Sequence, residues 1–284
     1  ERIDGVTEEG LPLRCRKDLL EERLFERTRD LFSVMDLVFF DTTSLYFEGE
    51  GGESLGRYGH SKDHRGDEHQ MIVGVVVDGA GRPICCQMWP GNVTDVTTLV
   101  PVVRGLRSRF SIGSVCVVAD RGMISARTIK HLEVQKLSYI LGVRMRRVKE
   151  VWAKVLRHRG SWQQITPERS RAKDPAPLRV KEVRVDEKRY VVCFNPEQAR
   201  KDAHDRQAIL ASLSEKLKGG STSLVGNKGY RKFVSSDGMA FAIDESKVKA
   251  DERFDGLWVL RTNTDLSTAD VALKYKQLLM VEMI

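Results

Sequence analysis

Three carboxylates occupy positions that the surrounding sequence predicts to lie close to the protein core. Asp41 directly follows the apolar run 37–40, and Asp120 directly follows the run 115–119. Short apolar runs of this kind are typical of central strands that are buried on both faces, so both aspartates are expected at a sheet. Glu282 lies on the otherwise apolar stripe of a helix predicted near the C-terminal end.

An ionised carboxylate that is buried alone is unstable, and three that converge repel one another. A divalent cation removes this repulsion, and a small set of hard oxygen ligands favours Mg²⁺ or Mn²⁺ over zinc. Each residue also has a simpler interpretation, because an aspartate after a strand is often a turn or helix-cap residue. A glutamate near a chain end is often solvated, so the metal-site hypothesis depends on the agreement of all three.

The apolar periodicity predicts a mixed α/β sheet with helices packed on it. The β-branched run 71–77 and the run 83–89 flank the turn 78–81, which predicts a hairpin. The other expected elements before residue 144 are helices over 13–35, 94–110 and 125–135, and strands over 37–40, 115–119 and 138–143.

After Arg144 the sequence changes character, which predicts an inserted module rich in strands over residues 145–262. The chain from 141 to 220 holds 20 Lys and Arg against 10 Asp and Glu, whereas residues 1–50 are acidic. We therefore expect the middle of the chain to face a polyanion, of which nucleic acid is the commonest kind. A basic surface that is simply solvated is the alternative.

Composition limits the class of protein. The 284 residues are 41% hydrophobic and 31% charged with a net charge of +7, which is typical of a soluble globular protein. The longest apolar stretch, 71–77, is far shorter than the roughly 20 residues of a membrane span, so we expect no membrane association. Five cysteines without a C-x-x-C pair argue against a disulfide scaffold and favour the reducing cytoplasm. The chain lacks an initiator methionine, and we expect a fragment of a longer gene product.

Several short motifs together resemble the DDE transposases of bacterial insertion sequences. They are Asp41-Thr42-Thr43-Ser44, the segment 59–67 (GHSKDHRGD) with Gln70, the segment 90–95 (PGNVTD), the segment 118–122 (VADRG) and the segment 255–263 (DGLWVLRTN). The C-terminal helix resembles the branch with a Tyr-x₂-Arg-x₃-Glu-x₆-Lys signature, in which Tyr275 and Glu282 have the required spacing. Leu278 stands where the signature has arginine, and the signature lysine would fall beyond Ile284.

The resemblance implies an RNase H-like catalytic core with a β-rich insertion between the last core strand and the helix that carries the glutamate. The expected organisation is an N-terminal helical segment over 1–35, the first part of the core over 36–144, the insertion over 145–262 and the catalytic helix over 263–284.

The resemblance also implies metal-dependent phosphodiester cleavage at transposon ends, followed by strand transfer to target DNA. Asp41, Asp120 and Glu282 would be both the catalytic acids and the ligands of two Mg²⁺ ions, with Mn²⁺ as a substitute. The implied partners are double-stranded DNA, namely the inverted repeats and the target, and a second copy of the chain in a DNA-bound homodimer. A bacterial cytoplasmic location, associated with the nucleoid, follows.

Ten further residues are candidates for contacts with DNA. Tyr275 is implied to hold a backbone phosphate and Trp258 to stack on an extruded base, although both are also compatible with core positions. The basic candidates are Lys62, His64, Arg65, Arg121, Arg144, Arg146, Arg147 and Lys149.

Two other functions remain open at this point. The chain could be an inactive, truncated DNA-binding or assembly remnant, or it could be an RNase H-like nuclease that does not transpose DNA.

Overall fold

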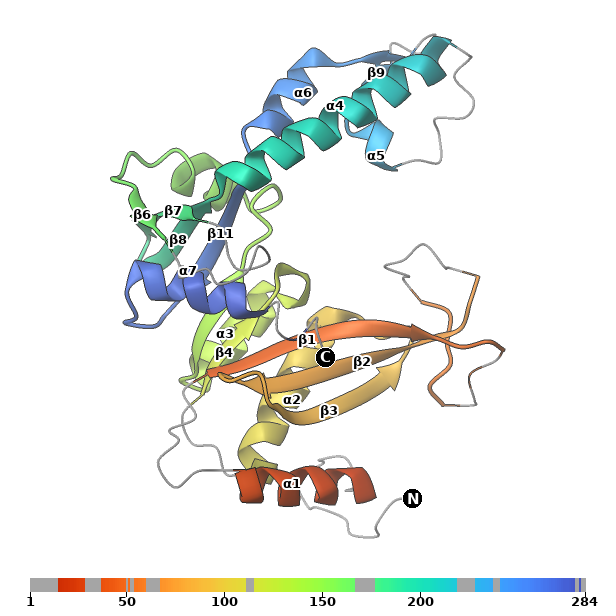
Figure 1. The fold of residues 1–284 in the computed structure, drawn as a ribbon, viewed down its shortest axis with the longest axis vertical. Helices are drawn as coiled ribbons and strands as arrows, with labels where there is room; N and C mark the ends of the chain where they lie inside the picture. Colours follow the sequence, from red (N-terminus) through yellow and green to blue (C-terminus); the bar gives the residue numbers. More distant parts are fainter. Residues whose placement is uncertain are drawn as a thin grey trace.

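A mixed sheet of nine strands runs through the described part of the chain (Figure 1). The computed structural model describes residues 15–28, 37–49, 51, 54–59, 67–110, 115–166, 177–218, 228–236, 241–278 and 281. The strands of the sheet are β1 (Leu37–Tyr46), β2 (Gln70–Asp78), β3 (Pro83–Pro90), β4 (Cys116–Ala119), β5 (Ser138–Gly142), β6 (Gln163–Ile165), β7 (Leu178–Val185), β8 (Lys188–Phe194) and β11 (Leu257–Thr262). Their order in space is β3-β2-β1-β4-β5-β11-β8-β7-β6.

Some of the helices cover this sheet, and others form a projection from it. They are α1 (Arg16–Thr28), α2 (Asp95–Phe110), α3 (Ala126–Val134), α4 (Pro196–Lys218), α5 (Lys228–Arg231), α6 (Glu245–Glu252) and α7 (Thr268–Lys276), with the short 3₁₀ helix η1 (Arg121–Met123) and π-helix η2 (Val151–Val155). The strands β9 (Val234–Ser236) and β10 (Phe241–Ile243) form a separate antiparallel pair.

The first five strands confirm the RNase H-like arrangement expected from the motifs. Strands β1, β2 and β3 are successively antiparallel, and β4 and β5 run parallel to β1. The hairpin expected around residues 78–81 is the turn between β2 and β3. The strand expected over 37–40 is longer than predicted, because β1 stays paired with β2 as far as Tyr46. Asp41 therefore lies within a strand and not just beyond its end.

Each face of the sheet has its own apolar core, because neighbouring residues of a strand point to opposite faces. Val38 and Phe40 of β1 pack in one cluster with Leu99 of α2 and Leu132 of α3. Phe39 packs on the other face in a cluster that includes residues of α7. Helices α2 and α3 thus cover one face of the part of the sheet formed by β1 to β5, and α7 covers the other.

The strands of the segment 145–262 continue the core sheet. β11 pairs antiparallel with β5 on one side and with β8 on the other, so the sheet passes without a break into β8, β7 and β6. The helical part between β8 and β11 projects from this sheet (Figure 1). It has a small core of its own around Leu213, Phe233 and Val248.

One arginine fastens this projection to the sheet. Arg206 of α4 is 7% exposed and donates from both terminal nitrogens to the two oxygens of Asp255, each at 2.6 Å. Asp255 lies just before β11, and the Asp255 carboxylate is the main reason that the pKa of Arg206 is raised. A planar, two-point contact of this kind fixes orientation as well as distance.

Replacing this arginine should destabilise the fold. We expect Arg206→Met to lower the free energy of unfolding by about 3 kcal/mol, because it leaves the Asp255 carboxylate without its partner. Urea unfolding monitored by circular dichroism measures the change. Arg200→Met, on an exposed position of the same helix, is the control and should change stability by less than about 0.5 kcal/mol. Equal stability of both variants would contradict the anchoring role.

Candidate active site

The parallel pairing of β1 with β4 brings two of the predicted acids together. The register pairs Phe40 with Ala119, and the next residues along the chain are Asp41 of β1 and Asp120, the first residue after β4. Because hydrogen-bonded strands are about 4.8 Å apart, this register places the two aspartates next to each other. Asp41 is half-buried, and its Oδ1 accepts a hydrogen bond from the Thr42 amide at 2.7 Å.

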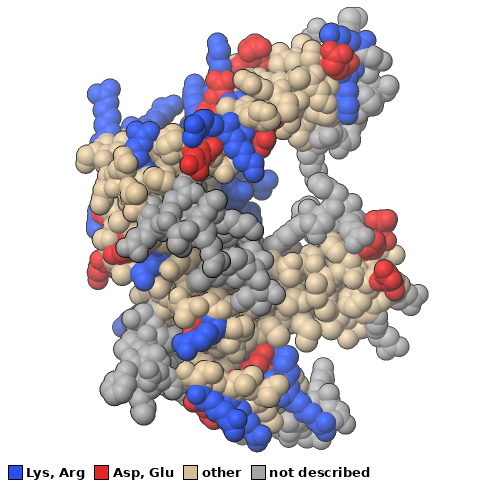
Figure 2. All heavy atoms as spheres, in the orientation of Figure 1, with Lys and Arg blue, Asp and Glu red and all other residues tan. Residues whose placement is uncertain are grey.

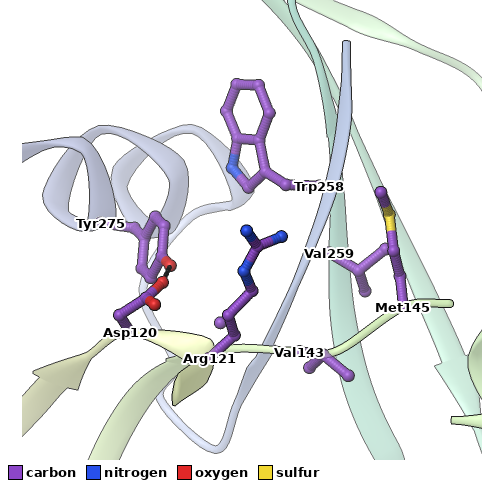
Figure 3. A pocket seen from close by; sticks show the side chains of 8 residues that line it. Asp120, Arg121, Val143, Met145, Trp258, Val259 and Tyr275 are labelled. Carbon is purple, nitrogen blue, oxygen red and sulfur yellow. Dashed lines mark hydrogen bonds between the residues drawn. The ribbon is translucent and has the colours of Figure 1, made fainter. Parts of the chain in front are cut away.

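Asp120 is held by hydrogen bonds to both of its carboxylate oxygens. Its Oδ2 accepts from the Gly122 amide at 3.3 Å, which makes Asp120 the N-cap of η1. Its Oδ1 accepts from the hydroxyl of Tyr275 at 2.8 Å (Figure 3). Tyr275 belongs to α7, so this bond joins the loop after β4 to the helix that covers one face of the sheet.

The tyrosine keeps its proton in this position. Burial raises the pKa of Tyr275, and the negative charge of Asp120 raises it further. The phenol therefore acts as a hydrogen-bond donor to the carboxylate throughout the physiological pH range.

Gly142, the last residue of β5, makes room for this contact. A Cβ atom at this position would collide with the Tyr275 hydroxyl and would lie 2.9 Å from the Arg121 amide nitrogen. Only glycine therefore allows the tyrosine to approach Asp120 over the end of β5.

A cavity of about 360 Å³ opens beside the tyrosine and the aspartate. Its lining residues are Asp120, Arg121, Gly142, Val143, Met145, Trp258, Val259 and Tyr275. In Figure 3 the Arg121 side chain extends toward the indole of Trp258. The Lys276 ammonium lies 5.0 Å from the centre of the Trp258 ring.

The aspartate pair fits the chemistry of a divalent cation site. Adjacent carboxylates offer hard oxygen ligands, and each can accept more contacts than the hydrogen bonds given above. Glu282, the third predicted ligand, lies outside the described residues. Within the described residues no group of three His, Cys, Asp or Glu side chains is arranged to hold a metal.

Two of the predicted DNA-contacting arginines are engaged within the protein. Arg144 donates to the backbone carbonyls of Arg121 at 3.1 Å and Gly122 at 2.8 Å, and so braces the turn that follows Asp120. Arg146 forms an ion pair with Asp251 at 2.7 Å.

The other basic candidates differ in what the structure describes of them. Arg147 and Lys149 are exposed and have no ion-pair partner among the described residues. Arg121 is exposed at the cavity. Lys62, His64 and Arg65 lie outside the described residues.

Sequence reasoning missed Gly142 and the bracing role of Arg144. Gly142 lies within the strand predicted over 138–143, and no local signal shows that its missing side chain leaves room for a distant tyrosine. The Arg144 contacts likewise depend on the loop after β4, which lies more than 20 residues earlier in the chain.

Filling the space at Gly142 should disturb the site. We expect Gly142→Ala to lower the free energy of unfolding by about 1–3 kcal/mol, because the added carbon must displace Tyr275 or the Arg121 backbone. Thermal or urea unfolding measures the loss. Gly79→Ala is the matched control, since a Cβ there would make only an ordinary contact with Leu37 at 3.9 Å. A Gly142→Ala protein as stable as the control would show that the tyrosine is not closely fitted.

Comparison with known proteins assigns the chain to a family. The sequence profile of the family described as "Transposase DDE domain" matches residues 33–277. No curated protein sequence matches the chain. Among solved structures, the chain is similar to the piggyBac transposase in a synaptic complex with hairpin DNA, at 13% identity and a TM-score of 0.43 over 88% of this chain and 40% of that one. It is also similar to the Mos1 transposase in a paired-end complex with the left transposon end, at 16% identity and a TM-score of 0.26 over 49% of this chain and 46% of that one.

The chain thus spans less than half the length of either of these transposases. The family profile covers most of the chain, from before β1 to the end of α7, and it includes both aspartates and Tyr275. The chain belongs to the family of DDE transposase domains.

Proposed function

We propose that this protein is the catalytic domain of a DNA transposase of the insertion-sequence type, which cleaves phosphodiester bonds at transposon ends and transfers the strands to target DNA. The observation that carries the proposal is the parallel register of β1 and β4, which brings Asp41 and Asp120 together in a chain that belongs to the DDE family. The assignment to the branch with the Tyr-Arg-Glu-Lys signature belongs to the same proposal.

Asp41, Asp120 and Glu282 would hold the divalent cations. When bound, a pair of Mg²⁺ ions, or Mn²⁺ in their place, supplies activation of the attacking oxygen and stabilisation of the leaving oxygen. The first attacking group is water, and the second is the 3′-hydroxyl that cleavage exposes. The protein side chains position these groups and reduce the negative charge around the phosphate.

Tyr275 has a positioning role in this proposal. Its hydroxyl donates to Asp120 Oδ1 at 2.8 Å, which orients the carboxylate and leaves its second oxygen toward the Gly122 amide. Arg144 supports the same turn through the carbonyls of residues 121 and 122. Two independent elements, α7 and the segment after β5, thus fix the direction of one catalytic acid.

The proposed partner is double-stranded DNA, comprising the transposon inverted repeats and the target, with two copies of the chain bound together on it. The excess of basic residues between 141 and 220 supports a polyanionic partner. No helix in the described residues is long and apolar enough to cross a membrane. A bacterial cytoplasmic location belongs to the same proposal, since the genomic DNA is there.

Removing either described acid should abolish cleavage without abolishing DNA binding. We expect Asp41→Asn and Asp120→Asn to slow cleavage by at least about a thousandfold, because each loses a metal ligand worth several kcal/mol in the transition state. The substrate is a plasmid that carries the inverted repeats flanking the gene, with Mg²⁺ or Mn²⁺ present, and the products are resolved on a gel.

The control for this experiment is Asp205→Asn, on an exposed position of α4, which should cleave at the wild-type rate. Gel-shift affinity of the Asp41 and Asp120 variants should stay within about threefold of wild type. Full cleavage by Asp41→Asn, in a preparation free of host nucleases, would refute the proposal. Nicked products without strand transfer would instead identify a nuclease of another kind.

Exposed basic residues after β5 should contribute to binding through counterion release. We expect Arg147→Gln and Lys149→Gln each to reduce the slope of log affinity against log salt by about 0.9 for duplex DNA. Arg146→Gln should change the slope less, because its guanidinium is already paired with Asp251. Fluorescence anisotropy between roughly 50 and 200 mM salt measures these slopes. Equal slopes for all three variants would show that the segment 146–149 does not contact DNA.

A further inference from the structure

A buried ammonium without a carboxylate partner lies in the part of the sheet beyond β11. Lys181 of β7 is only 7% exposed, and its Nζ donates to the His158 carbonyl at 2.7 Å. The same Nζ lies 5.0 Å from the centre of the Trp162 ring. No carboxylate among the described residues pairs with it, and burial lowers the pKa of Lys181. Among the described residues, a carbonyl dipole and an aromatic face hold this positive charge.

The segment that covers Lys181 is basic and exposed. It runs from Arg157 through Gly160 to Trp162, and every residue of it is exposed. Trp162 itself is 40% exposed, a large apolar surface for a side chain at the beginning of the edge strand β6. Between residues 144 and 166 the chain has seven Lys and Arg and one acidic residue, Glu150, which is paired with Lys188.

A second cation-aromatic pair lies next to the first. Arg179 and Phe194 are directly opposite each other on β7 and β8, and the Arg179 guanidinium lies 4.8 Å from the centre of the Phe194 ring. The Phe194 and Trp162 rings are 6.3 Å apart in an edge-to-face arrangement. The four side chains therefore form one continuous row, in which two adjoining rings are flanked by two cations and Trp162 and Arg179 are exposed. We call this row the Trp162 surface.

The Trp162 surface is separate from the candidate active site. Arg179 and Lys181 share a face of β7 with Val183, which packs in the cluster with Val155 and Tyr190. Leu178 and Val180 point to the other face and pack in the cluster that holds α7. The surface thus lies on the face of the sheet opposite to α7 and Tyr275. Lys and Arg side chains are prominent over the β6 and β7 end of the molecule in Figure 2.

We propose that the Trp162 surface binds an unpaired stretch of a nucleic-acid strand, with a base stacked on Trp162, the adjoining phosphate held by the exposed arginines of the 157–159 segment, and the buried charge of Lys181 adding attraction from beneath. Exposed aromatic rings beside positively charged side chains are the arrangement by which proteins hold single strands without reading sequence. An acidic peptide would be attracted by the cations but would gain nothing from the exposed ring. The choice of nucleic acid rests on the proposed function, whereas the site itself rests on these contacts.

The first test compares two exposed tryptophans. We expect Trp162→Ala to weaken binding of a labelled 20-nucleotide oligothymidylate by about 5-fold to 150-fold, the usual effect of losing one stacked base. Trp162→Phe should retain most of the affinity. The matched control is Trp152→Ala, because Trp152 is 39% exposed and has no cation over its ring among the described contacts. Fluorescence anisotropy in EDTA measures binding without any cleavage.

The second test concerns the charge. Lys181→Gln and Arg159→Gln should each reduce the salt slope for the oligonucleotide by about 0.7. Arg159 is exposed, so its variant remains informative if Lys181→Gln fails to fold. Lys154→Gln is the control, since Lys154 already pairs with Asp186 at 3.0 Å and should leave the slope nearly unchanged.

Two results would overturn the proposal. One is equal affinity of Trp162→Ala and Trp152→Ala for the oligonucleotide. The other is displacement of the oligonucleotide by poly-glutamate with no dependence on Trp162, which would identify a site for acidic protein. The binding assay in EDTA does not depend on cleavage. A failure of the Trp162 surface therefore appears in the binding assay, and a failure of the transposase assignment appears in the cleavage assay of the Asp41 variant.

Discussion

The parallel hydrogen-bonded register between β1 and β4 is the constraint on which the candidate active site depends. The two strands are far apart in the chain, and their pairing alone places Asp41 next to Asp120. A shift of one residue would turn one aspartate to the opposite face of the sheet. The register is protected because Val38 and Phe40 pack on one face and Phe39 on the other, so a slip would disrupt both cores at once.

The site combines two like charges with structural support that reduces their repulsion. Asp41 accepts from its own neighbouring amide, and Asp120 accepts from an amide and from Tyr275. Because the tyrosine is buried beside a carboxylate, it stays protonated and remains a donor. These bonds orient the carboxylates without neutralising them, which leaves their charge available to a divalent cation.

Sequence predicted the strands well but not their long-range partners. The apolar runs at 37–40 and 115–119 are near-continuous, and strands of that kind are buried on both faces. Residue 41 was expected beyond its strand because polar Thr42, Thr43 and Ser44 interrupt the apolar run, yet pairing with β2 keeps them extended. The pairing of β5 with β11, which makes the sheet continuous, could not be predicted from the local sequence either. Leu260 pairs with Gly142 across more than 100 residues, and hydrophobic patterning does not encode which strand is the neighbour.

The same limit applies to charge. The excess of Lys and Arg between 141 and 220 predicted a polyanion site, but composition counts charges without showing which are already paired. The structure divides the set: Arg146 is paired with the Asp251 carboxylate, whereas Arg144 and Lys181 donate to backbone carbonyls and have no carboxylate partner among the described residues. An internal ion pair contributes little to the external potential, because the opposite charge lies within 3 Å of it. A buried lysine without such a partner carries a charge that no carboxylate among the described residues offsets, and the anion proposed for the Trp162 surface would offset it. The location of a ligand on this domain is therefore better inferred from its uncompensated charges than from its most basic sequence segment.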